Sequence, residues 1–289
     1  LTDSKMLQII FFGILFGAVS SMIPKEKAKP VMDLVEGLNE VFVKMVMVIM
    51  KAMPFFVFAL MAGQIVKAAG SEPDKFTELM KFYLWYGGVV IAGLVTMAFI
   101  FYPIIVKIFT GLGFRKFLRS VKDAQITAFS TSSSVATLPV TMGCLENNLK
   151  VSKSTTSFVL PIGATVNMDG TSLYQGIAVV ALAQFHMVDL SILQQLIIVG
   201  TATLASIGAA AIPSAGLILM MVVLESVGLN PLWIAIIFPI DRILDMCRTV
   251  VNVTGDASVA AIIAYSENEI SSVDDLSLIH ISEPTRQVP

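Results

Sequence analysis

The stretch FSTSSSVATLPVT, Phe129–Thr141, places five hydroxyl residues in succession, Ser130 to Ser134, within a largely apolar chain. It lies in the middle of a segment without charged residues, 124–145. Two helical legs of about 11 residues would each rise by about 16 Å, roughly half the thickness of the hydrocarbon core of a bilayer. The stretch therefore predicts a re-entrant helical hairpin over about residues 120–150, with its tip at the membrane midplane.

One straight spanning helix is the alternative for the same segment. It would leave the hydroxyl run and Pro139 at the centre of the bilayer, where neither would have a purpose. Non-helical backbone is tolerated at that depth only where protein or a water-filled cavity satisfies its polar groups. The tip of a hairpin meets that condition, so the hairpin is the favoured interpretation.

The composition is typical of a membrane protein. The 289 residues are 56% hydrophobic and 14% charged, with a mean hydropathy of +0.83. Aromatic residues lie within apolar runs rather than among basic residues, which excludes a nucleic-acid-binding platform. Runs that are poor in charge and long enough to cross a membrane predict an all-α, multi-pass helical bundle, and they occur at 7–23, 41–66, 84–106 and 158–188.

The basic residues indicate the orientation of the chain in the membrane. They cluster at 25–29 and at 115–122, and two predicted spans separate the clusters. Both clusters can therefore face the cytoplasm, as the positive-inside rule requires.

A second segment repeats the pattern of the first hairpin. Residues 190–224 also lack charge, and their centre holds small residues and Pro213 within ASIGAAAIPSAG, which predicts a second hairpin over about 190–228. Each hairpin is followed by an apolar span with a polar break, NMDGT at Asn167–Thr171 and NVTGD at Asn252–Asp256. Interrupted hydrophobic segments in corresponding halves are typical of an inverted-repeat secondary transporter with a binding site at the midplane.

The last predicted span carries a stripe of polar and charged residues. They are spaced by four, three, four and four positions, which places them on one helical face: Asp241, Asp245, Arg248, Asn252 and Asp256. A charge at mid-membrane costs about 2.5 to 3.5 kcal/mol on the translocon scale, so the stripe must face a cavity or partner charges. A self-neutralising ladder of ion pairs between helices is the structural alternative to a binding site.

Four motifs together resemble the dicarboxylate/amino acid:cation symporter family, which includes glutamate and aspartate transporters. They are TSSSVATLPVT, LPIGATVNMDGTSLYQG, SIGAAAIPSAG and DRILDMCRTVVNVTGDA, in the order and spacing of that family. The resemblance covers 7–265 and implies that the family's first three spans and the start of its fourth are missing here. It implies a glutamate-transporter-like inverted repeat of two re-entrant hairpins and two broken transmembrane helices.

The resemblance also implies a division into domains. Residues 1–68, the end of the fourth span and the fifth, would form a trimeric scaffold, and residues 76–275 a mobile transport domain. The transport domain would contain the sixth span, the first hairpin, the seventh span at about 154–188, the second hairpin and the eighth span at about 231–266. The tail, 276–289, resembles translated sequencing adapter and is excluded from the fold.

Two sets of site residues follow from the resemblance. Substrate contacts would come from both hairpin tips and the last span: Ser133, Ser134, Ile212, Pro213, Gly216, Asp245, Arg248, Thr249 and Asn252. Sodium would bind at Gly163, Asn167, Asn252 and Asp256, at a second site of Thr165, Met168, Ser206, Ile207 and Ala209, and at a third to which Asn167 and Asp169 contribute along with third-span residues.

These residues imply a sodium-coupled symporter of L-aspartate or L-glutamate that works by alternating access. Arg248 suits a side-chain carboxylate, and Asp245 suits an α-ammonium group. We expect a homotrimer among membrane lipids in the plasma membrane, in a bacterium the inner membrane, with Na⁺ as a co-transported ion and no prosthetic group. The alternatives are a C4-dicarboxylate or neutral amino acid symporter, or a passive ion channel. An enzyme is not expected, because neither histidine, His186 or His280, can be paired with a nucleophile.

The chain departs from the family pattern at several positions. Archaeal members carry an arginine where Ser132 stands and animal members carry one where Met246 stands, whereas the nearest arginine here is Arg242. Ala211 occupies a position often held by glycine, which would stiffen the second tip. Gln175 stands where potassium-coupled animal members carry a titratable glutamate.

Overall fold

The computed structural model describes residues 6–52, 55, 58–59, 62–63, 73–209 and 214–269. Within these ranges every regular element is a helix, as the composition predicts. The expected span at 41–66 is described only to residue 52 and at five isolated positions beyond it. The predicted tail, 276–289, and the tip residues Ala211, Ile212 and Pro213 lie outside the described residues.

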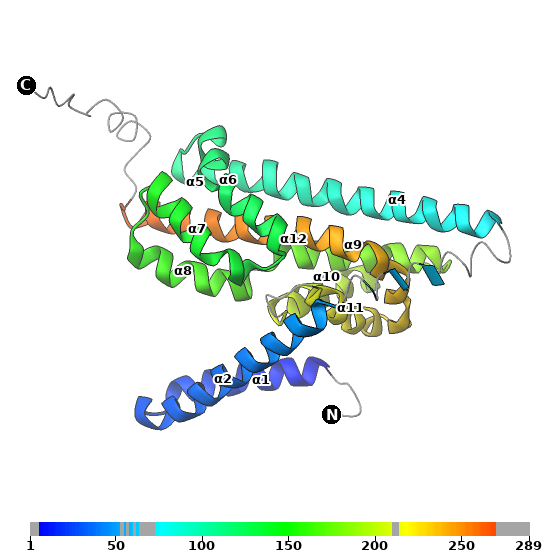
Figure 1. The fold of residues 1–289 in the computed structure, drawn as a ribbon, viewed down its shortest axis with the longest axis horizontal. Helices are drawn as coiled ribbons and strands as arrows, with labels where there is room; N and C mark the ends of the chain where they lie inside the picture. Colours follow the sequence, from blue (N-terminus) through cyan, green and yellow to red (C-terminus); the bar gives the residue numbers. More distant parts are fainter. Residues whose placement is uncertain are drawn as a thin grey trace, which may run out of the picture.

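The first two helices form a unit of their own. Helix α1 (Met6–Met22) and helix α2 (Lys25–Met50) contact each other and lie along one side of the bundle in Figure 1. Helix α2 begins within the basic cluster at 25–29, earlier than the predicted span. Large apolar side chains such as Phe12 and Leu34 are exposed, which suits helices that contact lipid or other protein.

A long composite helix follows, made of α4 (Pro73–Thr96), a π-helical turn η1 (Met97–Phe101) and α5 (Tyr102–Thr110). Its segment Phe76–Thr110, 35 residues, is the one helix in the described part that is long and apolar enough by itself to cross a membrane. It extends beyond the predicted run at 84–106 at both ends. Helix α4 packs against both α9 and α12.

The serine run forms the turn between α6 (Phe114–Thr131) and α7 (Ser134–Asn148), which pack against each other as the two arms of a helical hairpin. Ser132 closes α6 in the left-handed conformation, with φ of 52°. The arms have 18 and 15 residues, longer than the predicted 11. The difference arises because α6 begins at Phe114, before the basic cluster at 115–122, and α7 continues past Glu146, whereas a charge-free window excludes both parts. Whether the hairpin is re-entrant stays a prediction.

The first predicted polar break is confirmed. Helix α8 (Lys153–Val166) ends at Asn167, whose φ and ψ are −87° and 79°, and α9 (Asp169–Phe185) begins after Met168. Beyond it, α10 (Ile192–Ile207) and α11 (Ala215–Ser226) pack together as the second hairpin.

The second predicted break is wrong. After the short 3₁₀ turn η2 (Pro231–Trp233), helix α12 (Ile234–Ser266) runs for 33 residues without interruption through Asn252 and Asp256. The side chains of Asn252 and Asp256 make hydrogen bonds to groups at the α8–α9 break, and the backbone of α12 remains helical throughout. The polar residues in this segment therefore bind a neighbouring element and do not form a turn.

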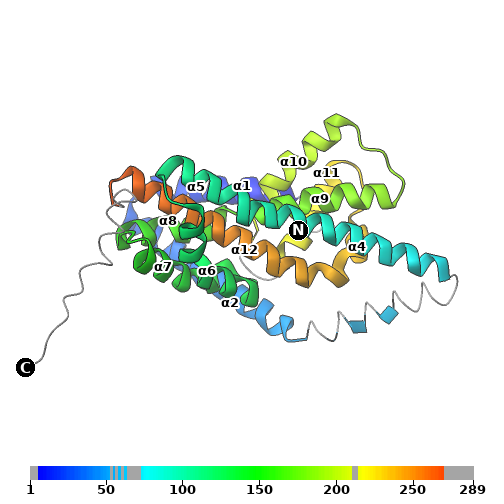
Figure 2. The same cartoon turned by 90° about the horizontal axis from the view of Figure 1, so that it is seen from above.

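Helix α12 lies at the centre of the bundle. It contacts α4 to α9 and α11, and both views show it between the α6–α7 hairpin at one end and the α10–α11 hairpin at the other (Figures 1 and 2). Two clusters of buried apolar residues include residues of α12 and fix the position of its polar face.

Candidate functional site

All five residues of the stripe on α12 are buried, as the pattern predicts. Their exposed fractions lie between 1% for Arg248 and 7% for Asp245. A buried charge is costly unless it has partners, so the contacts of these side chains decide what the face can bind.

Arg248 is the centre of the charged half of this face. Its Nη2 lies 2.5 Å from Asp245 Oδ1, and its Nη1 lies 3.1 Å from Asp241 Oδ1. The guanidinium carbon lies 3.9 Å from the ring centroid of Tyr174 on α9, a cation–π contact. The Tyr174 hydroxyl donates to Asp241 Oδ1 at 2.8 Å. An ion-pair ladder therefore exists, but it lies within α12, where Tyr174 supports it.

The second hairpin reaches this cluster from the other side. The N–H of Ser214 donates to Asp245 Oδ2 at 3.0 Å, and Ser214 has a positive φ of 61°. Gln175 Nε2 donates to the carbonyl of Gly216 at 2.9 Å. A Cβ on Gly216 would lie 3.7 Å from Arg248 Nη1. The start of α11 is therefore held beside the guanidinium, on the side where Ser214 contacts Asp245.

Several polar atoms of this region are buried without a hydrogen-bond partner in the described part of the chain. They are Arg248 Nε, Asp241 Oδ2, Gln175 Oε1 and the hydroxyl of Tyr86. Buried polar groups are nearly always satisfied in native proteins. These atoms are therefore positions at which water or a polar solute would be bound.

Arg242, the nearest arginine to the family's position, lies at the edge of the cluster. Its Nη1 is 3.8 Å from Asp245 Oδ2, and its side chain is 41% exposed. It contributes a positive charge near Asp245 without a close hydrogen bond, so it is a weaker partner for this carboxylate than Arg248.

The polar break between α8 and α9 meets the other half of the α12 face. Asn167 Nδ2 donates to Asp256 Oδ1 at 2.9 Å. A Cβ on Gly163 would come within 2.6 Å of the same oxygen, so the carboxylate lies directly against the α8 backbone. Asn252 Oδ1 accepts from the N–H of Gly170 at 2.8 Å. The first predicted sodium set is thus brought together at the break.

Asp169 and Met168 belong to the same neighbourhood. Asp169 accepts a hydrogen bond from the Tyr102 hydroxyl, and Asn252 Nδ2 lies 3.2 Å from Met168 Sδ. Thr249, closer to the charged cluster, donates to the backbone carbonyl of Asp245. Asn252 therefore lies between the predicted substrate residues and the predicted sodium residues.

The first hairpin tip is organised by its own hydroxyls. Ser133 caps α7 by accepting from the N–H of Ala136 at 3.2 Å, and Ser134 is 3% exposed. The Ser132 hydroxyl is buried without a partner among the described residues. Ala128, one turn earlier, belongs to the same apolar cluster as Val253 of α12. No hydrogen bond or ion pair joins Ser134 directly to Arg248 in the described part of the chain.

The second predicted sodium set is not assembled in the same way. Thr165 is exposed and its hydroxyl donates to the Ile162 carbonyl, while Ile207 is 39% exposed. Ser206 and Ala209 are buried, and the N–H of Ala209 donates to the Ser206 carbonyl. Thr165 lies on α8, Met168 lies in the break after it, and Ser206, Ile207 and Ala209 lie at or just beyond the end of α10. Helices α8 and α10 contact each other, but no contact between the side chains of the set is seen in the described part.

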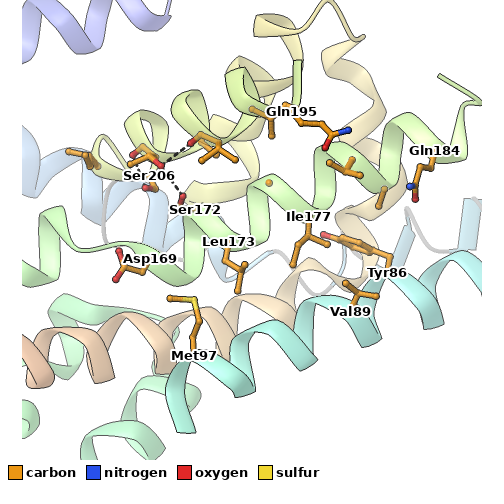
Figure 3. Close-up of a pocket in the computed structure, with 18 of the residues that line it drawn as sticks. Tyr86, Val89, Met97, Asp169, Ser172, Leu173, Ile177, Gln184, Gln195 and Ser206 are labelled. Carbon is orange, nitrogen blue, oxygen red and sulfur yellow. Dashed lines mark hydrogen bonds between the residues drawn. The ribbon is translucent and has the colours of Figure 1, made fainter. Parts of the chain in front are cut away.

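A cavity of about 1220 Å³ lies between α4, α9 and α10. Figure 3 shows Asp169, Ser172 and Ser206 towards one end, and Tyr86, Gln184 and Gln195 towards the other. The wall between them is largely apolar, with Val89, Leu173 and Ile177 on it. The cavity thus extends from the polar break along the apolar residues between α4, α9 and α10.

Sequence reasoning missed several residues of this site. Tyr174 lies on the same motif as Asn167, and its helical spacing from Thr171 could have placed it on the inner face. Ser214 carries no distinguishing signal, because only the structure shows its positive φ. Tyr102 is a hydroxyl within an apolar run beside a proline, which is a weak signal for a buried polar contact.

Comparison with known proteins shows the family of the chain. Residues 1–266 match the sodium:dicarboxylate symporter family. An excitatory amino acid transporter of Caenorhabditis elegans is 40% identical over 274 residues, covering 94% of this chain and 53% of that protein. Excitatory amino acid transporter 3 of Oryctolagus cuniculus is 39% identical over 281 residues, covering 97% and 52%. Excitatory amino acid transporter 1 of Ambystoma tigrinum is 42% identical over 274 residues, covering 93% and 48%.

The described helices form a bundle with buried, paired charges at its centre. The chain belongs to the sodium:dicarboxylate symporter family. It spans about half the length of the curated relatives that it matches.

Proposed function

We propose that the whole protein is a sodium-coupled symporter of acidic amino acids, L-aspartate or L-glutamate, in which residues 76–275 move as a transport domain. The observation that carries this proposal is the buried Arg248, which lies where α9, α11 and α12 meet. Its Nε has no partner in the described part of the chain. A planar guanidinium with spare donors suits a carboxylate, and the match to the sodium:dicarboxylate symporter family supports an acidic solute.

Asp245 supports an amino acid rather than a dicarboxylate as the substrate. Its two oxygens accept from Arg248 and from the N–H of Ser214. An α-ammonium group could replace the Ser214 contact and neutralise the carboxylate. A buried ion pair by itself adds little stability, so the Asp245–Arg248 pair is better explained as a recognition device than as a structural ladder.

Sodium would bind at the polar break, where Asn167, Asp169 and Asp256 supply oxygen atoms. Hard oxygen ligands suit a small hard cation, and the carboxylates balance its charge. We keep the second set, with Ser206 and Ala209, as a proposed site of backbone carbonyls that would require the C-terminal end of α10 to move closer to Thr165 on α8. The family's third sodium site also uses residues of its third span, which this chain does not include.

The remaining parts of the proposal concern assembly and location. The exposed apolar faces of α1 and α2 fit a scaffold, residues 1–68, that pairs with copies of itself in a homotrimer and with membrane lipids. We place the protein in the plasma membrane, in a bacterium the inner membrane, with the basic clusters at 25–29 and 115–122 on the cytoplasmic side.

Calorimetric titration of the full-length protein tests the substrate. In sodium, L-aspartate should bind about 100-fold more tightly than succinate or L-serine, because succinate has no ammonium group for Asp245 and L-serine has no second carboxylate for Arg248. Equal affinity for succinate and L-aspartate would remove the ammonium role of Asp245 and favour a dicarboxylate carrier. Ohmic current through proteoliposomes without saturable uptake would instead indicate a channel.

Gln175 predicts that the protein does not counter-transport potassium. It is fully buried and its amide is bonded to the Gly216 carbonyl, and a neutral amide carries no proton. With voltage clamped, uptake into proteoliposomes loaded with potassium should match uptake into those loaded with choline. A severalfold acceleration by internal potassium would contradict this expectation.

A further inference from the structure

The long helix of α4 and α5 changes its hydrogen-bond pattern just before Tyr102. Residues Met97–Phe101 form a π-helical turn, and the N–H of Tyr102 donates to the carbonyl of Met97, five residues earlier. The next residue, Pro103, has no N–H, and in a regular α-helix its ring would clash with the carbonyl of Phe99. The wider π turn relieves that conflict, and such turns are frequent at functional sites.

The π turn directs Tyr102 into the protein. Tyr102 is 5% exposed, whereas its neighbours Phe101 and Ile104 are 48% and 44% exposed. Its hydroxyl donates to Oδ2 of Asp169, the first residue of α9. A tyrosine whose ring is buried needs a partner for its hydroxyl, and here that partner is a carboxylate at the polar break.

The backbone of α12 makes room for this hydroxyl. A Cβ on Gly255 would come within 2.7 Å of both the Tyr102 hydroxyl and Asn167 Nδ2. Asn167 Nδ2 in turn donates to Asp256 Oδ1. The phenol group therefore lies where α5, α12 and the α8–α9 break meet, against the residue that precedes Asp256.

We propose that Tyr102 is a positioning residue for cation binding at the polar break. It holds one oxygen of Asp169, so that the other oxygen stays available to a cation at the break, where Asn167 also supplies a side-chain oxygen. Both of these oxygens are free of hydrogen bonds within the described ranges. The phenol is a neutral donor, so it fixes the carboxylate without offsetting the negative charge that attracts the cation.

This inference rests on the proposed sodium coupling and adds to it a residue of α5. It also gives a reason for the π turn, because a regular helix containing Pro103 would lose a backbone hydrogen bond and point this side chain elsewhere. The composite helix would thereby be coupled to the ion site through one hydrogen bond.

The test is Tyr102→Phe in the full-length protein, measured by titrating L-aspartate at a series of sodium concentrations. The variant should need about 10-fold more sodium for half-maximal binding, because a hydrogen bond to a carboxylate is lost. Its affinity for L-aspartate at saturating sodium should stay within about twofold of the wild type, because Arg248 and Asp245 are not in contact with Tyr102. A change in packing alone would not separate the two quantities in this way.

Tyr83→Phe is the matched control. Tyr83 lies on the same composite helix, and its hydroxyl also bonds to a single partner, the Ile236 carbonyl at 2.7 Å. This variant should leave the sodium dependence unchanged. An equal shift in both variants, or no shift in Tyr102→Phe, would overturn the proposed role.

Two further variants guard against a folding defect. Gly255→Ala keeps the Tyr102 hydroxyl but displaces it, and should shift the sodium dependence in the same direction. In an Asp169→Asn background, Tyr102→Phe should produce no additional shift, because its effect acts through that carboxylate. Wild-type binding that is indifferent to replacing sodium with choline would contradict the proposed function itself, whereas sodium dependence that is identical in Tyr102→Phe contradicts only the role of Tyr102.

Discussion

Replacing Arg248 by cysteine in the full-length protein is expected to abolish high-affinity binding of L-aspartate and to shift preference towards neutral amino acids. The guanidinium is 1% exposed and lies 2.5 Å from Asp245 and 3.1 Å from Asp241. The solute's carboxylate would lose two charged hydrogen bonds to the guanidinium, worth about 1.5 to 3 kcal/mol each, which corresponds to at least about a 100-fold loss of affinity. Calorimetric titration with L-aspartate and L-serine measures both changes.

Arg242→Cys is the control for this prediction. It removes the same charge from the same helix, but its side chain is 41% exposed and its nearest contact with Asp245 is 3.8 Å. Partly exposed pairs are worth about 1 kcal/mol or less, so the loss should be no more than about fivefold. Thermal unfolding of both variants in detergent checks that they fold. Equal losses in the two variants would mean that the overall charge of the site, and not the guanidinium of Arg248, determines the affinity for L-aspartate.

Asp256→Asn is expected to weaken sodium coupling by about 10-fold or more, because it removes the negative charge that compensates a bound cation. The carboxylate is 3% exposed, and the substitution preserves its shape. The measurement is the sodium concentration that gives half-maximal uptake of L-aspartate into proteoliposomes. Asp123→Asn, on the exposed side of α6, is the matched control and should have no effect.

A second variant tests the same carboxylate without changing its charge. Gly163→Ala would place a methyl group 2.6 Å from Asp256 Oδ1 and 2.9 Å from its Cγ, so the carboxylate must move. The sodium dependence should shift in the same direction as in Asp256→Asn. Normal sodium dependence in both variants would move the ion site away from the polar break.

The helical hairpins and the buried stripe on α12 were predictable from the sequence because charge is scarce in this chain. Each charge-free segment with small or hydroxyl residues at its centre lies within a pair of packed helices. The stripe was predictable because a 3.6-residue period determines which side chains share a face. The bounds of α6 were not predictable, since basic residues at 115–122 fit an amphipathic helix as well as a loop.

The contacts that define the site depend on long-range packing. Asn252 and Asp256 looked like a break because their polarity was attributed to their own backbone, whereas they bond to Gly170 and Asn167 across the bundle. The roles of Tyr174 and Tyr102 depend on partners 67 residues away in the sequence. A local sequence pattern cannot predict hydrogen bonds between residues so far apart in the chain.

Because α12 is uninterrupted, the residues along it move together as one rigid body. Asp245 and Asp256 are 11 residues apart on one rigid helix, which separates them by about 16 Å along its axis. A tilt or translation of that helix would displace the proposed amino acid and cation sites by a common rigid-body movement. Under the proposed function, the two sites would therefore change their exposure to the two sides of the membrane together.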